Sequence, residues 1–312
     1  MRVSDDSFQN NSGNGHIPVL LKETVCMLAP KDGGKYLDCT FGGGGHTRAI
    51  LESADCTVVA IDRDPEAAKR AEKLGLEFGG RFEFHSAKFS QLDEFGGGYD
   101  GILFDFGVSS YQLDEAYRGF SINKEASLDM RMNSGEGESA LDYLNRVSEF
   151  ELGGVLREYG EEKSFRKVAR AIISARDCGK IKTTTDLAAV VSSALPNLRG
   201  HIHPATKTFQ ALRIQVNDEL GEIRAALPKA FDALKSGAVM AAISFHSLED
   251  RIVKQFFKRE AGRPESRADH SYVQDRTKRA SLLTSKPIVA AAEEIRQNPR
   301  SRSAKLRGLR KD

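Results

Sequence analysis

The stretch from Lys35 to Asp62 constrains the fold of this chain more than any other part of the sequence. It holds a short apolar run, four consecutive glycines, a segment of helical character and a β-rich run that ends on an acidic residue. Two parallel strands joined in this way form a pocket for a nucleotide-type ligand at the carboxyl edge of a sheet. Glycine is needed because the turn is tight and the backbone must approach the ligand without a Cβ atom in the way. We therefore predict such a pocket, in which the Asp62 carboxylate accepts hydrogen bonds from both hydroxyls of a ribose.

The spacing of the glycines narrows the choice of ligand. A dinucleotide fingerprint requires glycine at three positions, in the pattern G-x-G-x-x-G. In this chain Thr47 or Arg48 occupies the third position, depending on which glycine is counted first, so the pyrophosphate-binding pattern is incomplete. S-adenosylmethionine carries a ribose and an adenine but no phosphate, and it needs only the turn and the acid. The pattern therefore favours S-adenosylmethionine. A nicotinamide or flavin cofactor and a turn without any ligand stay as alternatives.

Composition excludes several other classes of protein. No run approaches the roughly 20 apolar residues of a membrane span. The first 15 residues are polar, lack the apolar core of a secretory signal, and predict a disordered arm. The four cysteines form no C-x-x-C pair, which argues against a zinc site and a disulfide framework. We therefore expect a cytoplasmic protein with free thiols and no metal site.

The net charge of +2 hides a strong asymmetry along the chain. From Arg251 to Asp312 there are 17 basic and 7 acidic residues, whereas the preceding 250 residues hold 29 basic and 37 acidic ones. A basic end on an acidic body predicts a polyanionic partner for that end. A solvated basic tail without a partner is the alternative.

Strand-like runs recur after the glycine turn and predict an open α/β sheet. Asp64 is the expected N-cap of the next helix, because a proline follows it at the first helical position. Further strands are predicted at Arg81–His85, Tyr99–Asp105 and Gly237–Phe245, a helix at Asn217–Ser236, and last short strands at Lys286–Ile295 and Ser303–Arg310. Gly262–Thr284 is charged and aperiodic, and predicts a flexible or partner-ordered loop.

The middle of the chain has a different character. From Asp114 to about Leu212 there is no clear strand pattern, and amphipathic runs such as Glu161–Arg176 predict helices. Helices of this kind within an α/β pattern indicate an inserted all-helical domain. The chain then divides into a disordered arm (1–15), the first part of an α/β domain (16–113), the helical insertion (114–212) and the second α/β part with the basic end (213–312).

The ends of the predicted strands supply the candidate site residues. Asp62, Phe89 and Asp105 all lie at the carboxyl edge, where open sheets bind ligands. We expect Phe89 to stack on adenine, although core packing is an equal alternative. His46 follows the glycines directly, and a surface or capping role is the alternative to a ligand contact. His246 follows the fifth strand and is a candidate catalytic residue, expected to touch a base or phosphate. A cap formed by Ser247 and Asp250, or a satisfied histidine, is the alternative.

Asp105 opens a polar-then-apolar loop, Phe106–Ser110, which suits a particular chemistry. The exocyclic amine of cytosine or adenine delocalises its lone pair into the ring. It needs hydrogen-bond acceptors that pull on its N–H bonds while the nitrogen attacks a methyl group, so catalysis is mainly in-line positioning and electrostatics. Asp105 is therefore a candidate catalytic residue. A structural or cofactor-contacting acid is the alternative.

Long motifs along the whole chain carry a family resemblance. The motifs are His16–Leu21, Asp38–His46, Ala60–Pro65, Asp105–Asp114, Arg118–Ser121, Leu128–Met132, His203–Arg213, Ser244–Arg251 and Asn298–Ser303. In this order they closely resemble the bacterial small-subunit ribosomal RNA (cytosine-N4) methyltransferases of the MraW/RsmH family. The resemblance covers the chain from about His16 to the C-terminus. Phe106 stands where that family usually has an aliphatic residue, and Gly262–Thr284 diverges.

The resemblance implies a Rossmann-like class I methyltransferase sheet with an inserted helical domain. It implies S-adenosylmethionine-dependent methylation of the N4 amine of a cytidine in the decoding region of the small-subunit (16S) RNA. The implied cofactor contacts are Gly44, Gly45, His46, Asp62, Phe89, Asp105 and Gln112. Expected partners are the small-subunit RNA or the assembled subunit, and a second copy in a homodimer, with no membrane. A nicotinamide-dependent oxidoreductase and a ribosome-assembly factor with a vestigial pocket are the rival functions.

Overall fold

The computed structural model describes residues 17–196, 203–266, 269 and 276–312, and the predicted arm at 1–15 lies outside them. The described residues form two compact units. One contains the residues up to Phe106 and from Arg224 onward, and the other is Gly107–Ile223. The sequence analysis drew its domain boundaries after residues 113 and 212, whereas the two compact units divide after residues 106 and 223. The sequence-based boundaries stay predictions.

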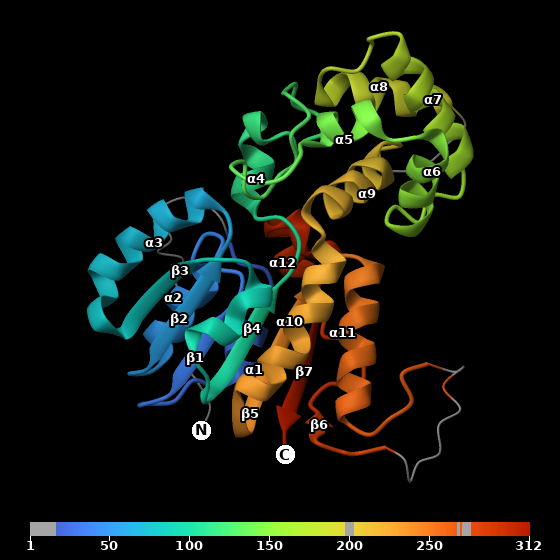
Figure 1. Ribbon diagram of the computed structural model, residues 1–312. Helices are drawn as coiled ribbons and strands as arrows, with labels where there is room; N and C mark the ends of the chain where they lie inside the picture. The colour runs from blue at the N-terminus through green and yellow to red at the C-terminus, as the bar shows by residue number, and fades with distance from the viewer. Residues whose placement is uncertain (1–16, 197–202, 267–268, 270–275) are drawn as a thin grey trace. The chain divides into compact units, whose positions relative to one another are not determined.

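A seven-stranded sheet forms the centre of the first unit (Figure 1). Its strands are β1 (Lys35–Asp38), β2 (Thr57–Asp62), β3 (Phe82–Ser86), β4 (Tyr99–Asp105), β5 (Leu234–Ser244), β6 (Ala280–Leu282) and β7 (Lys305–Lys311). They lie in the order β3-β2-β1-β4-β5-β7-β6, with β1 to β5 parallel and β7 antiparallel to both of its neighbours. This arrangement confirms the Rossmann-like class I methyltransferase sheet expected from the resemblance.

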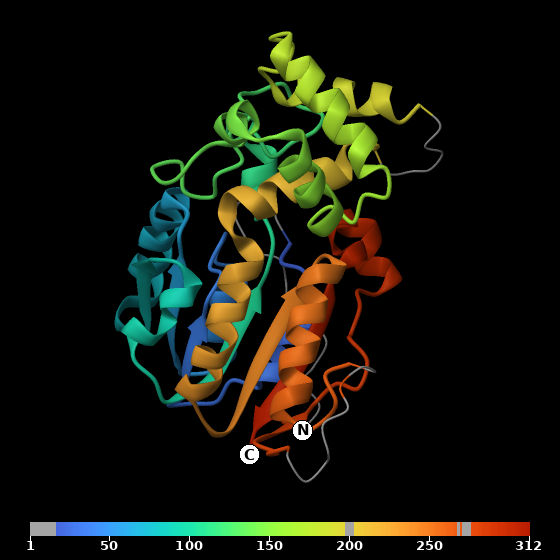
Figure 2. The same cartoon turned by 45° about the vertical axis from the view of Figure 1, so that its right-hand side comes forward.

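Helices cover the sheet of the first unit. They are α1 (Leu21–Leu28), α2 (Gly45–Ser53), α3 (Pro65–Phe78), α10 (Glu219–Ala233), α11 (Ser247–Glu260) and α12 (Ala292–Gln297), with 3-10 turns η1 (Gly79–Arg81), η2 (Phe89–Phe95) and η5 (Pro299–Ser303). Figure 2 shows α10 and α11 side by side over one face. Ile50 of α2 and Leu74 of α3 join Leu103 and Ile243 of the strands in one buried core. Strands buried in this way read as continuous apolar runs, which is why β4 and β5 were recognisable in the sequence.

Several local predictions are confirmed and others are wrong. Asp64 caps α3 and accepts from the Glu66 N–H, as predicted. The helix expected at Asn217–Ser236 is α10, which ends at Ala233 because β5 begins three residues before the predicted strand. Lys286–Ile295 is not a strand: it contains one bridge, from Ile288 to Leu306, and the start of α12. The missing strand is β6, inside the segment expected to be a loop, and three residues are too few to show a period.

The second unit is helical, as the sequence indicated. Its elements are α4 (Ser110–Asp114), η3 (Ala116–Arg118), α5 (Ala140–Arg146), α6 (Glu149–Glu158), α7 (Phe165–Asp177), α8 (Thr184–Ala194) and α9 (Thr206–Asn217). Ser139, Ser148 and Thr183 each form a capping box that begins a helix, which fixes where α5, α6 and α8 start. Leu152 and Ile172 lie in the centre of this unit's own apolar core.

None of the helices among the described residues is both long enough and apolar enough to cross a membrane.

Candidate active site

Three acidic residues mark the carboxyl edge of the sheet. Asp38 ends β1, Asp62 ends β2 and Asp105 ends β4. The parallel register pairs Asp38 with Ala60 and Leu103, so each strand reaches the same edge within about two residues. The strand register therefore places Asp62 and Asp105 at one edge of the sheet, as the sequence predicted. Asp38 was part of a recognised motif but had no assigned role.

The glycine turn between β1 and α2 depends on glycine at specific positions. Gly42 and Gly44 have φ of 52° and 76°, a left-handed conformation that a residue with a Cβ atom rarely adopts. A Cβ on Gly44 would also come within 2.7 Å of the Phe41 ring, and one on Gly45 would overlap the ring of Pro18. The side chains of Phe41 and Pro18 therefore pack closely against the backbone on one side of the turn. Gly44 is the N-cap residue of α2, so the amide groups of the first helical turn point toward the sheet edge.

Asp62 is held by backbone groups at the tip of β2. Its Oδ2 accepts from the Gly42 N–H at 2.7 Å, and its Oδ1 accepts from the Asp64 N–H at 2.8 Å. Arg70 donates to the carbonyl of Gly42 at 2.9 Å and so fixes the same turn. Burial raises the pKa of Asp62 to about 6, against the opposing effect of these hydrogen bonds. Each carboxylate oxygen keeps a second lone pair, which suits a carboxylate that orients a diol.

A buried network ties the acids of β1 and β4 together. The Thr47 hydroxyl donates to Asp38 Oδ2 at 2.7 Å, and the Thr40 N–H donates to Asp38 Oδ1 at 3.0 Å. The Thr40 hydroxyl in turn accepts from the Asp105 N–H at 2.6 Å. Sequence reasoning missed this network. The only signal was an aspartate with a threonine two residues later, a spacing that favours a local side-chain to backbone bond.

Asp105 carries an unsatisfied oxygen. Its Oδ1 is buried and finds no hydrogen-bond partner in the part of the chain that the structure describes. Its Oδ2 lies 3.7 Å from His46 Nδ1. Burial, followed by the nearby charges of Asp38 and Glu249, raises the pKa of Asp105 well above its usual value. A buried oxygen without a donor is costly, so it indicates a ligand position.

His46 is buried rather than exposed. Its Nε2 lies 3.1 Å from the carbonyl oxygen of Val19, and burial lowers its pKa to about 4. The imidazole is therefore neutral at neutral pH, with its proton on the nitrogen that faces the carbonyl. The surface role that the sequence left open is wrong, and its Nδ1 is left facing Asp105.

Phe89 begins η2 and is half-buried at the same edge. Its ring packs edge-on against Phe104 and Phe106, with centroids 6.0 and 5.9 Å away. The aliphatic-to-aromatic departure at Phe106 thus supplies one of these contacts. The structure shows the packing role, and stacking on adenine stays a prediction.

Gln112 lies in the second unit, in α4, where it belongs to a capping box. Its Oε1 accepts from the Ser109 N–H at 3.0 Å, and the Ser109 side chain accepts from the Gln112 N–H at 3.3 Å. These bonds hold the loop after β4 in a defined turn. The cofactor contact expected for Gln112 stays a prediction.

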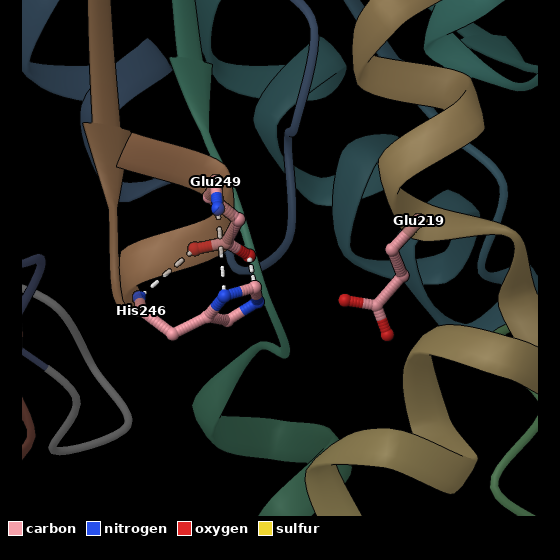
Figure 3. A group of neighbouring side chains, drawn as sticks. All are labelled: Glu219, His246 and Glu249. Atoms are coloured by element: carbon pink, nitrogen blue, oxygen red, sulfur yellow. Dashed lines mark hydrogen bonds and ion pairs between the residues drawn. The ribbon is translucent and has the colours of Figure 1, made fainter. Parts of the chain in front are cut away.

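His246 is the N-cap of α11, a position at which the sequence offered Ser247 with Asp250 (Figure 3). The Glu249 N–H donates to His246 Nδ1 at 3.5 Å, and the His246 N–H donates to Glu249 Oε2 at 3.2 Å. His246 Nε2 also lies 3.1 Å from Glu249 Oε1. The Ser247–Asp250 cap is therefore wrong. A fully satisfied histidine is not found either: Nδ1 accepts from the Glu249 N–H, whereas the buried Nε2 makes no hydrogen bond among the described residues. A catalytic role for His246 stays a prediction.

Comparison with known proteins decides the family. The model of the MraW methylase family matches residues 13–312. The chain belongs to this family. A ribosomal RNA small subunit methyltransferase H from Gluconobacter oxydans is 47% identical over 301 residues, covering 95% of this chain and 93% of that protein. Its namesake from Parvibaculum lavamentivorans is 48% identical over 306 residues, covering 95% and 89%. A solved rRNA methylase from Streptococcus thermophilus is 11% identical, with a TM-score of 0.43 and coverage of 95% and 98%, and at that score it adds nothing to the assignment.

As a member of the MraW methylase family the protein is a methyltransferase, and its methyl donor is S-adenosylmethionine. The residues present fit that cofactor. The backbone N–H groups of Gly42 and Asp64 fix the carboxylate of Asp62 beside the glycine turn, which suits a ribose. The unsatisfied Oδ1 of Asp105 suits an N–H donor, such as the ammonium group of the methionine part.

Proposed function

We propose that this methyltransferase acts on small-subunit ribosomal RNA and methylates the exocyclic N4 amine of a cytidine in the decoding region. Two relatives that match it over 95% of its length are named ribosomal RNA small subunit methyltransferase H, which supports the substrate class. The observation that carries the chemistry is the buried, unsatisfied oxygen of Asp105 at the carboxyl edge of the sheet. An acceptor in that position is what an aromatic amine requires.

When bound, the cofactor supplies a methyl group on a positively charged sulfur. Asp62 orients the ribose, because its carboxylate cannot rotate while two backbone N–H groups hold it. Asp105 would serve both ligands, holding the ammonium group of the cofactor and accepting from the N–H of the target amine. A cationic ligand favours the ionised form of Asp105, which counters the two carboxylates that raise its pKa.

After methyl transfer the amine would have one proton to lose, and the protein would have to hold and accept it. Asp105 is the residue proposed to accept that proton, because its buried Oδ1 has no hydrogen-bond partner among the described residues. Positioning and electrostatics supply the rate, and no covalent bond to the protein is needed. His246 is a second candidate contact for the base, although its own helix already engages its imidazole.

The basic C-terminal region is proposed to bind the RNA backbone. Exposed cations are found on α11, around β6 and on β7, namely Arg251, Arg259, Lys278, Arg279 and Arg310. Contacts of this kind release counterions, so RNA binding is expected to weaken steeply as salt rises. RNA affinity that does not change with salt concentration would mean that this region does not bind the RNA backbone. Three further points stay predictions: binding to naked RNA or to the assembled subunit, formation of a homodimer, and a cytoplasmic location.

Mass spectrometry of nucleosides from small-subunit RNA tests the proposal. RNA from cells without the protein is incubated with the purified chain and isotope-labelled S-adenosylmethionine. We expect label in N4-methylcytidine, and labelling about 100- to 1000-fold slower with the Asp105→Ala variant. RNA binding without any labelled nucleoside would favour the assembly factor with a vestigial pocket. A thermal shift with NADH but none with S-adenosylmethionine would favour the oxidoreductase.

A further inference from the structure

The segment Ile17–Leu20 packs against the start of α2. The carbonyl oxygen of Val19 lies 3.1 Å from His46 Nε2, and a carbonyl can only accept, so the ring nitrogen donates. Pro18 fills the space beside Gly45 so closely that a Cβ atom there would overlap the proline ring. This segment, which we name the strap, therefore contacts the two residues that follow the tight part of the glycine turn.

Two side chains from near the end of the chain hold the strap in place. Glu294 of α12 accepts through Oε1 from the Leu20 N–H at 2.8 Å. Asn298 donates through Nδ2 to the carbonyl oxygen of Ile17 at 2.9 Å. The partners are separated by 274 and 281 residues in sequence. Both bonds go to backbone atoms, so they fix the path of the strap whatever its side chains are.

The strap does not adopt this path by preference. Leu20 has φ of 51° and ψ of 36°, a left-handed conformation that costs free energy for a residue with a Cβ atom. Its side chain is fully buried. Strained backbone of this kind persists where its surroundings over-determine it, and it clusters at ligand sites. The bond from Glu294 is made to this strained residue.

We propose that the strap is a positioning element for the cofactor turn, and that Glu294 and Asn298 are the positioning residues that hold it against Gly45 and His46. The inference rests on the proposed cofactor site and adds residues to it that do not touch the ligand. The strap fixes His46, which faces Asp105, and it packs against the turn at Gly45. When the strap is released, the turn loses one wall and binds the cofactor less tightly.

Calorimetry with S-adenosylmethionine tests this inference on the full-length protein. We expect Glu294→Ala and Asn298→Ala each to weaken binding about threefold, and the double variant about tenfold, which corresponds to about 1.4 kcal/mol. Glu294→Gln keeps an acceptor oxygen and is expected to bind within about twofold of the parent protein. Glu293→Ala is the matched control, because Glu293 is exposed on the same helix and pairs only locally, with Arg296 and Gln297, in the described structure.

Hydrogen exchange without cofactor provides the readout that a merely structural role would not move. The double variant is expected to exchange faster in the first turn of α2, whereas β4 and β5 keep their protection. Faster exchange throughout the first unit would overturn the proposal, because it would mean general destabilisation. Asp62→Ala separates the two claims. If it abolishes binding while the double variant binds like Glu293→Ala, the strap proposal fails and the site stands. If Asp62→Ala binds normally, the site itself fails and the strap proposal with it.

Discussion

The tips of β2 and β4 hold similar carboxylates in different circumstances. Asp62, at the tip of β2, has both oxygens engaged by backbone N–H groups. Asp105, at the tip of β4, has one buried oxygen without a partner among the described residues and a neutral histidine 3.7 Å from the other. Burial raises the pKa of both. At Asp62 the backbone hydrogen bonds and Arg70 oppose this rise and the nearby Asp64 adds to it, whereas at Asp105 the carboxylates of Asp38 and Glu249 add to it and no lowering effect from the described residues opposes it.

This difference indicates separate roles for the two acids, with Asp62 in cofactor binding and Asp105 in methyl transfer. A carboxylate that the backbone fixes is already shaped for a ligand that arrives as a neutral diol. A carboxylate left unsatisfied among like charges gains most when a cation or an N–H donor arrives, because that ligand removes the cost of its burial. We therefore expect changes at β2 to act on cofactor affinity, and changes at β4 to act mainly on methyl transfer.

The largest expected effect is that of Asp105→Ala. Removing the acceptor should lower the turnover number of methyl transfer about 100- to 1000-fold, the usual range for a lost transition-state hydrogen bond. Single-turnover assays at saturating cofactor measure it. Asp55→Ala, at an exposed acid on the loop before β2, is the control and should retain full activity. A variant that loses affinity but not turnover would reverse the assignment of the two acids.

Asp62→Ala should affect binding instead. Loss of a charged acceptor for two hydroxyls is expected to weaken cofactor binding about 100-fold or more, measured by calorimetry. Asp62→Asn keeps one acceptor oxygen, so its cofactor affinity should lie between that of Asp62→Ala and that of the parent protein. Unchanged affinity in Asp62→Ala would remove β2 from the site.

The pH dependence of cofactor binding is a second test of the role of Asp62. Because the pKa of Asp62 is raised to about 6, its carboxylate is ionised at pH 7 to 8 and gains a proton as the pH falls through 6. Affinity is therefore expected to be constant above pH 7 and to fall by up to about tenfold for each unit below 6. Calorimetry between pH 5 and 8 measures this. In Asp62→Asn the decline centred near 6 should disappear, and a curve identical to the parent's would assign the titration to another group.

The smallest effect is expected at the network that joins Asp38 at the tip of β1 to Asp105 at the tip of β4. Thr47→Val removes the hydroxyl that donates to the buried Asp38, and should lower the free energy of unfolding by about 1 to 2 kcal/mol. Thermal or denaturant unfolding measures the change. Thr47→Ser keeps the hydroxyl and should lose less. A loss in Thr47→Ser without a loss in Thr47→Val would show that packing of the Thr47 methyl group, and not the hydrogen bond, stabilises this site.

Much of the site could be predicted because it follows from strand ends. A parallel sheet places the carboxyl ends of its strands together, so Asp62 and Asp105 were found from the runs that precede them. The network of Asp38 with Thr47 was not predicted, because a threonine on a helix next to a turn reads as an ordinary helical residue. His246 as an N-cap was missed for a related reason: serine is the common capping residue, and it stands one position later.

Long-range contacts and very short elements were beyond the reach of the sequence. The three residues of β6 are too few for a pattern, and only pairing with β7 defines them. The bonds from Glu294 and Asn298 to the strap join residues more than 270 positions apart, and no local pattern predicts them. The left-handed conformation of Leu20 was equally invisible, since leucine rarely adopts it.

The hydrogen bonds between the strap and the last helices also have a consequence for synthesis of the chain. The strap leaves the ribosome first, but Glu294 and Asn298 are made 274 and 281 residues later. At translation rates of about 5 to 20 residues per second, the wall of the cofactor turn waits roughly 14 to 55 seconds for its anchors. A nascent or truncated chain that lacks its last 20 residues therefore holds the glycine turn and both acids, and yet lacks the contacts that fix the strap.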